Sequence, residues 1–262
     1  TTNPLPGGIF GLYADEDILN ADGAVVVKKD TLIEKVTTNG EGKAAFTSDL
    51  PIGFGYYVKE VQAPENYLRN LEDKYSFRFS YTNDEEAKVQ FAHTFSNERV
   101  NAAIVLQKKD AETNTNVPQG DASLEQAVYG VYARKDIVHP DGKTGVLYKA
   151  GTQVATLTVD AKGNAKAEDL YLGKYYVKEI TPPVGYLPDE EEHDIEVSYE
   201  GDKTKTVERT AESPEQVEKQ PFQVIKAANN GKTDADLLSG VGFSAYLVSS
   251  LKVNADGSYD FT

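Results

Sequence analysis

The sequence predicts an all-β protein, built as tandem antiparallel β-sandwiches. Short segments rich in Val, Ile, Tyr, Phe and Thr alternate apolar with polar residues, and turn signals separate them at close intervals. Similar segments recur along the chain at a spacing comparable to the length of one domain. Helical periodicity is scarce, since only Ala14–Asn20 and Asn83–Ala87 could form a single turn. The turn signals are Asp22-Gly23, Asn39-Gly40, Asp141-Gly142, Gly163-Asn164 and Asp256-Gly257.

Two pairs of segments establish the repeat. Tyr56–Leu68 recurs as Tyr175–Leu187, and Phe10–Ala14 recurs as Tyr129–Ala133, both at an offset of 119 residues. A further copy opens at Phe243. We therefore predict a first repeat over residues 1–100 that lacks its first strand, a complete second repeat over 101–219, and the start of a third over 220–262. The ends look cut, which predicts an internal piece of a longer polypeptide, and the short polar junctions predict closely coupled domains.

Composition narrows the classes of function. The chain has 262 residues, a formal net charge of −15 and no cysteine. This acidity argues against nucleic acid and anionic membranes as partners, because both select basic surfaces. The lack of cysteine excludes disulfides and thiolate metal sites. No apolar run is long enough to span a bilayer, and no signal sequence opens the chain. His93, His139 and His193 show no metal-ligand spacing, so we expect neither metal nor cofactor.

Polar side chains fall on strand faces that the alternation predicts to be buried. Lys108 is in phase with the apolar residues of its strand, and Lys226 with those of Phe222–Lys226. Glu60 and Glu179 take the same position in the two repeats, and Asn97 is in phase within Phe91–Asn97. Each placement has an ordinary alternative, because a lysine at a strand end can extend its ammonium to solvent and a glutamate there can be solvated.

A buried lysine, carboxyl and asparagine together form a reactive set. Desolvation lowers the pKa of a lysine and leaves a nucleophilic neutral amine. The same apolar site raises the pKa of a glutamate, which can then polarise the carboxamide and shuttle protons. Attack of the amine on the amide carbon expels ammonia and leaves a Lys–Asn isopeptide bond. The expected bonding residues are Lys108, Lys226 and Asn97, with Glu60 and Glu179 as proton shuttles that act only within the chain.

The sequence resembles the Cna B-type (prealbumin-like, SpaA-like) domains of Gram-positive surface adhesins and pilins. The motif Gly173-x-Tyr175-Tyr176-x-x-Glu179 followed by Pro183-x-Gly185-Tyr186 carries the resemblance. It is preceded by Leu124-x-x-Ala127-x-Tyr129-Gly130-x-Tyr132. The first repeat matches from Leu5 to Tyr67, with Asn66 at the position of Gly185. The resemblance implies a prealbumin-like or reverse immunoglobulin sandwich, with the lysine on the first strand and the asparagine or aspartate on the last.

The second repeat departs from that pattern at its last strand. Glu212 is the nearest equivalent of Asn97, and it is in phase with the polar residues Glu208 and Thr210. The sequence therefore predicts a Lys108–Glu179 pair but no isopeptide bond in the second repeat. The first repeat supplies Glu60 and Asn97, and the third supplies only Lys226.

The resemblance implies a stalk segment of a surface protein, cell wall-attached and outside the cell. A covalent tie between first and last strands would stabilise each domain by about 4–5 kcal/mol, by analogy with a disulfide closing a loop of ~100 residues. One alternative is an adhesin module whose loops bind host matrix protein or glycan. Another is a glycosidase using Glu60 and Glu179, which the sequence disfavours because the repeat places them in separate domains. The expected partners are the neighbouring domains of the same chain.

Overall fold

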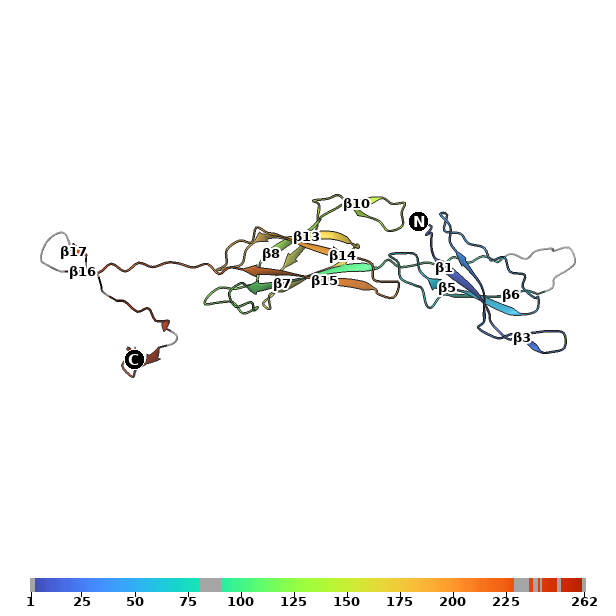
Figure 1. Cartoon of the computed structure of the whole chain (residues 1–262), viewed down its shortest axis with the longest axis horizontal. Coiled ribbons are helices and arrows are strands. Elements are labelled where there is room, and N and C mark those ends of the chain that lie inside the picture. The colour runs from blue at the N-terminus through green and yellow to red at the C-terminus, as the bar shows by residue number, and fades with distance from the viewer. Residues whose placement is uncertain are drawn as a thin grey trace. The chain divides into compact units, whose positions relative to one another are not determined.

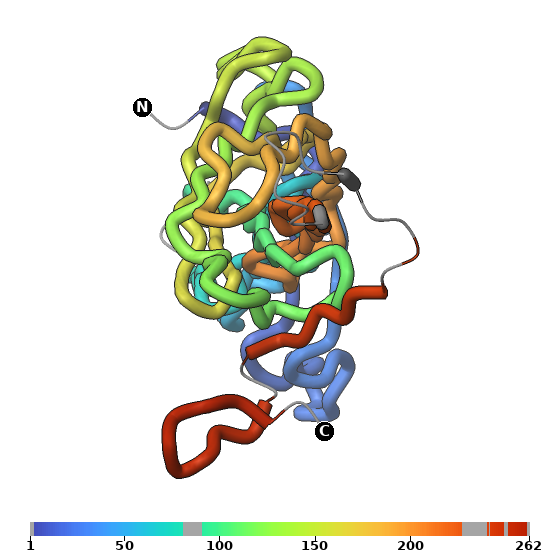
Figure 2. The backbone as a smooth tube through the Cα atoms, turned by 90° about the vertical axis from the view of Figure 1, so that its left-hand side faces the viewer, coloured from blue at the N-terminus to red at the C-terminus, as the bar shows by residue number. Residues whose placement is uncertain are grey.

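The computed structural model describes residues 3–80, 91–228, 236–237, 240, 242–248 and 251–260. It divides into two compact units, residues 1–218 and 219–262. Strands dominate, and the described residues contain no α-helix. The all-β prediction is therefore confirmed. None of the described residues forms a helix long and apolar enough to cross a membrane. Figure 1 labels the strands along the chain, and Figure 2 traces the backbone from another side.

The first repeat contains one four-stranded antiparallel sheet. Its order is β4-β1-β5-β6, and a short hairpin, β2-β3, lies beside it in sequence. The core beneath the sheet includes Phe10, Leu12 and Tyr56. The strands are β1 (Ile9–Ala14), β2 (Ile18–Leu19), β3 (Val25–Val27), β4 (Leu32–Thr37), β5 (Gly55–Gln62) and β6 (Lys74–Arg78).

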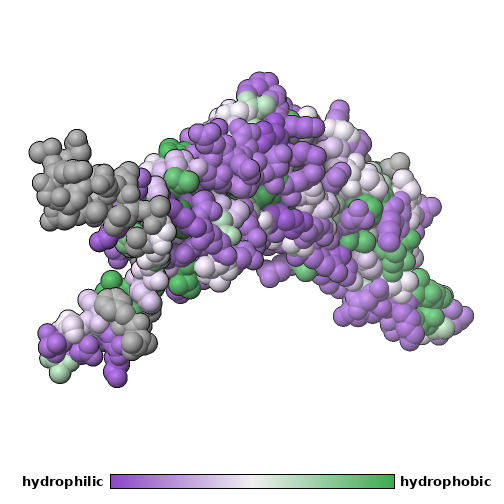
Figure 3. All heavy atoms as spheres, turned by 60° about the vertical axis from the view of Figure 1, so that its left-hand side comes forward, coloured by the Kyte–Doolittle hydropathy of each residue, from purple (hydrophilic) through white to green (hydrophobic). Residues whose placement is uncertain are grey.

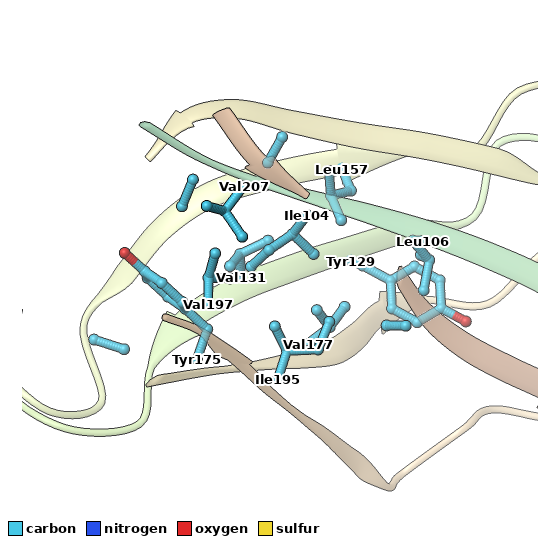
Figure 4. Packing of buried hydrophobic residues seen from close by; sticks show 14 of the residues in the cluster. Ile104, Leu106, Tyr129, Val131, Leu157, Tyr175, Val177, Ile195, Val197 and Val207 are labelled. Atoms are coloured by element: carbon cyan, nitrogen blue, oxygen red, sulfur yellow. The ribbon is translucent and has the colours of Figure 1, made fainter. Parts of the chain in front are cut away.

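Besides the short hairpin β9-β10, the second repeat contains two sheets packed face to face. One has the order β11-β8-β13-β14, and the other has the order β12-β7-β15. Figure 4 shows Ile104, Leu106 and Tyr129 packed between them. The strands are β7 (Asn101–Asp110), β8 (Val128–Ala133), β9 (Ile137–Val138), β10 (Val146–Tyr148), β11 (Gln153–Thr158), β12 (Asn164–Leu170), β13 (Gly173–Thr181), β14 (Glu192–Val197) and β15 (Thr206–Glu215).

The first and last strands of the second repeat are direct neighbours. β7 and β15 run parallel through ten register pairs, from Asn101↔Thr206 to Asp110↔Glu215 (Figure 1). β12 pairs with the other edge of β7 in the antiparallel sense. β7 is thus the centre of its sheet, and this position buries its lysine between two neighbouring strands.

The register shows that the two repeats are equivalent around their glutamates. Phe10 pairs with Glu60 across β1 and β5, and Tyr129 pairs with Glu179 across β8 and β13. The loop after each glutamate strand needs a left-handed residue, since Asn66 has φ +72° and Gly185 has φ +82°. This requirement explains why asparagine can replace glycine there.

Three local predictions are wrong. Ala14–Asn20 forms no helical turn, because its acidic side chains bind neighbouring strands: Glu16 accepts from the Gly55 N–H at 2.6 Å. Residues 91–97 and 222–226 form no strand, although both alternate as predicted. A strand needs a hydrogen-bonding neighbour, and neither segment has a described strand beside it that corresponds to β7 or β15 of the second repeat. Asn83–Ala87 lies outside the described residues.

The unit over 219–262 contains only short hairpins among its described residues. They are β16 (Ala227–Ala228) with β17 (Asp236–Leu237), and β18 (Lys252–Val253) with β19 (Tyr259–Asp260). Lys226 is exposed, as are Phe222 and Val224, so the predicted burial of this set is wrong for the structure described.

Candidate functional site

Lys108 lies at the end of β7, inside the sandwich of the second repeat. The backbone of β7 is held there by Gly163, whose carbonyl accepts the Lys108 N–H at 2.7 Å. Gly163 has φ +77°, and a Cβ at this position would lie 2.9 Å from the Lys108 carbonyl oxygen. Only glycine therefore allows this close approach. The Lys108 side chain is 0% exposed, which confirms that it faces the core.

Three polar groups surround the Lys108 ammonium. Its Nζ lies 2.7 Å from Oε1 of Glu179 and 2.8 Å from the Tyr129 hydroxyl, and it also contacts Oε1 of Glu215. The Glu179 side chain is 2% exposed and that of Glu215 is 0% exposed. The predicted pairing of Lys108 with Glu179 is thus present, in a site closed to water.

Glu215 is the residue that sequence reasoning missed. Tyr67 bridges to Arg99 in the first repeat, and its counterpart Tyr186 bridges to Val217 in the second. Counting back two residues from each bridge partner places Glu215 at the position of Asn97. The assignment of Glu212 to that position is therefore wrong. Glu212 points outward and pairs with Lys109 at 2.7 Å.

Burial dominates the electrostatics of Glu215. It raises the pKa of this carboxyl to about 7, although hydrogen bonds from Lys108 and Tyr129 oppose the shift. Its Oε2 atom is buried without a hydrogen-bond partner among the described residues. A buried, unpartnered oxygen is costly for a carboxylate and much less costly for a neutral acid. Both observations favour a proton on Glu215 at pH values well above those at which an exposed glutamate is protonated.

A chain of hydroxyl groups connects Glu215 to Asp189. Tyr129 contacts Glu215 at 2.6 Å and Ser213 at 2.8 Å, and Ser213 donates to Oδ2 of Asp189 at 2.9 Å. The Tyr129 hydroxyl donates to Oε1 of Glu215, and the Ser213 hydroxyl donates to the Asp189 carboxylate. Oε1 of Glu215 therefore accepts a hydrogen bond, whereas its Oε2 has no partner among the described residues.

The first repeat holds Glu60 and Asn97 together. The Asn97 side-chain amide donates to both Glu60 carboxyl oxygens, at 2.9 and 2.8 Å, and to the Leu68 carbonyl at 2.8 Å. Glu60 is 3% exposed, as predicted, and burial raises its pKa. It also accepts the Asn70 N–H at 2.7 Å, just as Glu179 accepts the Asp189 N–H at 2.8 Å. The two glutamates therefore have equivalent backbone support.

The two sites differ in what faces the glutamate. Among the described residues, no lysine hydrogen-bonds to Glu60 or Asn97. Where the second repeat has Tyr129 and Ser213, the first has Phe10 and Phe95, whose ring centroids are 4.7 Å apart. The first site is thus an apolar wall around an acid and an amide, whereas the second is a polar cluster around an ammonium.

Comparison with known domains agrees with this architecture. A model of the SpaA prealbumin-like fold domain matches residues 1–94 and 102–212, which together are more than half of the chain. The chain therefore belongs to the family of SpaA-type prealbumin-like domains. A comparison with curated proteins found no match.

Among solved structures, the TIE protein of Bacillus anthracis is similar in fold. It is 22% identical, with a TM-score of 0.51, over 82% of this chain and 32% of the TIE chain. This chain thus spans about a third of that protein. The minor pilin GBS52 of Streptococcus agalactiae is 19% identical over 85% of this chain and 87% of its own, with a TM-score of 0.31. The shaft pilin SpaA of Lactobacillus rhamnosus GG is 15% identical over 84% and 91%, with a TM-score of 0.30. The two pilins superpose too loosely to enter the argument.

Proposed function

We propose that this chain is a structural stalk segment of a bacterial adhesin or pilin, cell wall-attached and outside the cell. The observation that carries the proposal is the parallel pairing of β7 with β15. A pull on the two ends of the second repeat enters β7 at Asn101 and leaves β15 at Glu215, at opposite ends of the ladder. All ten register pairs then bear the load together in shear.

The composition and the site fit a structural role better than an enzymatic one. Glu60 and Glu179 occupy equivalent positions in separate repeats, and each is hydrogen-bonded within its own repeat. They do not form the facing carboxylate pair that a glycosidase needs. The face in Figure 3 is mostly hydrophilic, with hydrophobic residues in scattered patches, as suits a solvated surface segment.

Single-molecule pulling tests the stalk proposal. Because the chain has no cysteine, introduced cysteines give unique attachment points. Pulling through both chain ends loads β7 and β15 in shear, whereas pulling through Asn101→Cys and Thr206→Cys peels them apart from one end. We expect much higher resistance in the first geometry. Equal forces in the two geometries would contradict a load-bearing role.

The first repeat is proposed to belong to the type tied by a Lys–Asn isopeptide bond. In the second repeat β7 lies between β12 and β15, and the equivalent segments of the first repeat, about residues 45–51 and 91–97, form no strands. A lysine-bearing strand between them would complete the sheet and bring an amine to Glu60 and Asn97.

A peptide tests that assignment. Residues 101–110 carry the β7 pattern with its lysine, so this peptide should dock beside residues 91–97 of the full chain and bond to Asn97 with loss of one ammonia. Asn97→Ala should abolish the adduct, and a peptide with Lys108→Met should dock without bonding. An adduct that persists in Asn97→Ala, on a boiled denaturing gel and by intact mass, would show that the electrophile is assigned wrongly.

Binding of a host matrix protein or a glycan is the second candidate, and no contact of the described residues favours it. A depression of about 580 Å³ borders both repeats, but its lining includes one charged side chain, Glu65, and one aromatic ring, Tyr199. Such sparse polar and aromatic groups would orient a ligand poorly.

A further inference from the structure

We propose that Lys108 and Glu215 join in an amide bond between Nζ and Cδ, formed with loss of one water molecule. The proposal deepens the stalk function, on which it rests for its purpose. Its chemistry differs from a Lys–Asn bond, because the group on the last strand is an acid and the leaving group is water.

The placement of the two side chains meets the geometric requirement. Lys108 and Ser213 are register partners on adjacent parallel strands, and Glu215 lies two residues further along the same face of β15. The ammonium nitrogen contacts Oε1 of Glu215 directly, without room for water between them. Because a rigid sheet already holds the reacting groups in contact, the reaction avoids most of the entropic cost of bringing them together.

Because of the charge balance of the cluster, a single proton transfer converts the lysine ammonium into a reactive neutral amine. Lys108 faces two buried carboxyls, Glu179 and Glu215, so full ionisation would leave one excess negative charge in an apolar site. With one carboxyl protonated, the cluster is neutral as an ammonium, a carboxylate and an acid. Moving one proton from Nζ to Glu179 then gives a neutral amine, with both carboxyls protonated, at no change in total charge.

The step balances without any further reactant. The Nζ lone pair attacks Cδ of the protonated Glu215 and forms the C–N bond. The C–O bond to one carboxyl oxygen breaks, and that oxygen leaves as water after it takes a proton lost by Nζ. Glu179, whose Oε1 lies 2.7 Å from Nζ, carries that proton between the two atoms. Tyr129 donates a hydrogen bond to the developing oxyanion from 2.6 Å.

Burial gives the reaction its driving force. The reactants hold an ion pair away from water, and desolvation of both charges offsets much of their attraction. The product is a neutral amide and a neutral acid, which the same site accommodates without charge. Amide formation is unfavourable for free groups in water, so the exclusion of water from this site is essential to the proposal.

The same two strands contain a natural control pair. Lys109 lies one residue after Lys108 on β7, and Glu212 lies three residues before Glu215 on β15, with Nζ of Lys109 and Oε1 of Glu212 2.7 Å apart. Their side chains are 24% and 57% exposed, so both groups keep their water and their charges. The proposal therefore predicts a bond at Lys108 and Glu215 and none at Lys109 and Glu212.

Intact mass of the folded full chain, followed by tryptic mapping, tests the proposal. We expect a chain lighter than its sequence by one water molecule, and a branched peptide that joins Lys108 to Glu215 and is uncleaved after Lys108. Lys108→Met and Glu215→Ala should each restore the full mass, whereas Lys109→Met and Glu212→Ala should keep the deficit.

Glu215→Gln gives a sharper outcome, because glutamine would release ammonia in place of water. The deficit of this variant, relative to its own sequence, should change from one water to one ammonia. Full mass in the folded wild-type chain overturns the proposal, whatever the variants do. That result would leave the shear geometry and the pulling experiment unaffected, so the two proposals fail separately.

Discussion

Removing Lys108 should make the stability of the second repeat fall as the pH rises. In Lys108→Met no amide can form, and Glu215 stays buried beside Glu179. The folded-state pKa of Glu215 is raised to about 7, against 4.5 for the exposed group. Lys108 lowers that pKa, so its removal moves the value further upward.

The sign follows from linkage. A carboxyl whose pKa is raised on folding stabilises the folded state most at low pH, where it is protonated in both states, and this contribution is lost as the pH rises through the folded pKa. Each pKa unit corresponds to about 1.4 kcal/mol, so the shift from 4.5 to about 7 amounts to about 3 kcal/mol. Most of it should be lost between about pH 5 and pH 8. The side chain is fully buried, so solvent screening does not reduce the figure.

Hydrogen–deuterium exchange of the β7 amides, corrected for the intrinsic exchange rate at each pH, reports the opening free energy of this repeat alone. The matched control is Lys108→Met with Glu179→Gln and Glu215→Gln, in which both buried carboxyls are gone. We expect the single variant to lose protection with rising pH and the triple variant to stay nearly flat. A flat profile in the single variant, or greater protection at high pH, would refute the burial argument.

Three further substitutions, two of them with a control substitution, test individual contacts. Arg99→Ala should destabilise the second repeat by about 2–3 kcal/mol in urea denaturation, because its guanidinium binds the Leu170 and Asp169 carbonyls at 2.8 and 2.9 Å; Arg134→Ala, at a more exposed ion pair, should cost under about 1 kcal/mol. Tyr186→Phe should cost about 1–2 kcal/mol, since its hydroxyl donates to the buried Asp110 at 2.9 Å, and no loss in urea denaturation would contradict that role. Tyr129→Phe should lower the fraction of chains that lack one water, as measured by intact mass after a fixed time of folding, whereas Tyr175→Phe should leave that fraction unchanged.

Alternation along strands was enough to predict the burial of three site residues. Lys108, Glu60 and Glu179 all lie where a period of two places them, and the offset of 119 residues identifies the two glutamates as equivalent. These predictions succeed because each residue lies on the central strand of its sheet or next to it, where neighbours on both sides fix the register.

The last strand was harder to read because the spacing changes there. The offset between repeats falls from 119 at the glutamates to 118 at the bridges of Arg99 and Val217, so a constant offset points from Asn97 to Gln216 and misses Glu215. The assignment of Glu212 followed the polar phase of the strand. Glu215 could have been found from the other face of the last strand, because it alternates in step with Val207, Ala211 and Ser213, which are all buried. Pro214 argues against a strand, but β15 is an edge strand, and its outward position needs no ladder hydrogen bond.

The other wrong predictions concern segments that have no described strand to pair with. Residues 91–97 alternate well enough to predict a strand, yet their backbone is irregular. Side-chain pattern specifies which face is buried, while the strand itself depends on hydrogen bonds to another segment. The side chains of Phe95 and Asn97 still reach Phe10 and Glu60, so the pattern predicted the contacts but not the secondary structure.

The two repeats differ together at three positions that surround one conserved carboxyl. Phe10, Phe95 and Asn97 of the first repeat correspond to Tyr129, Ser213 and Glu215 of the second. The physical reason is that the side chain on the last strand donates hydrogen bonds in the first repeat and accepts them in the second. Asn97 brings its own donors, satisfies Glu60 and the Leu68 carbonyl, and leaves aromatic rings to close the site. Glu215 instead accepts at Oε1, where the Tyr129 hydroxyl donates to it at 2.6 Å, and Ser213 links Tyr129 to the Asp189 carboxylate. The hydroxyl groups are therefore a consequence of placing an acid on the last strand.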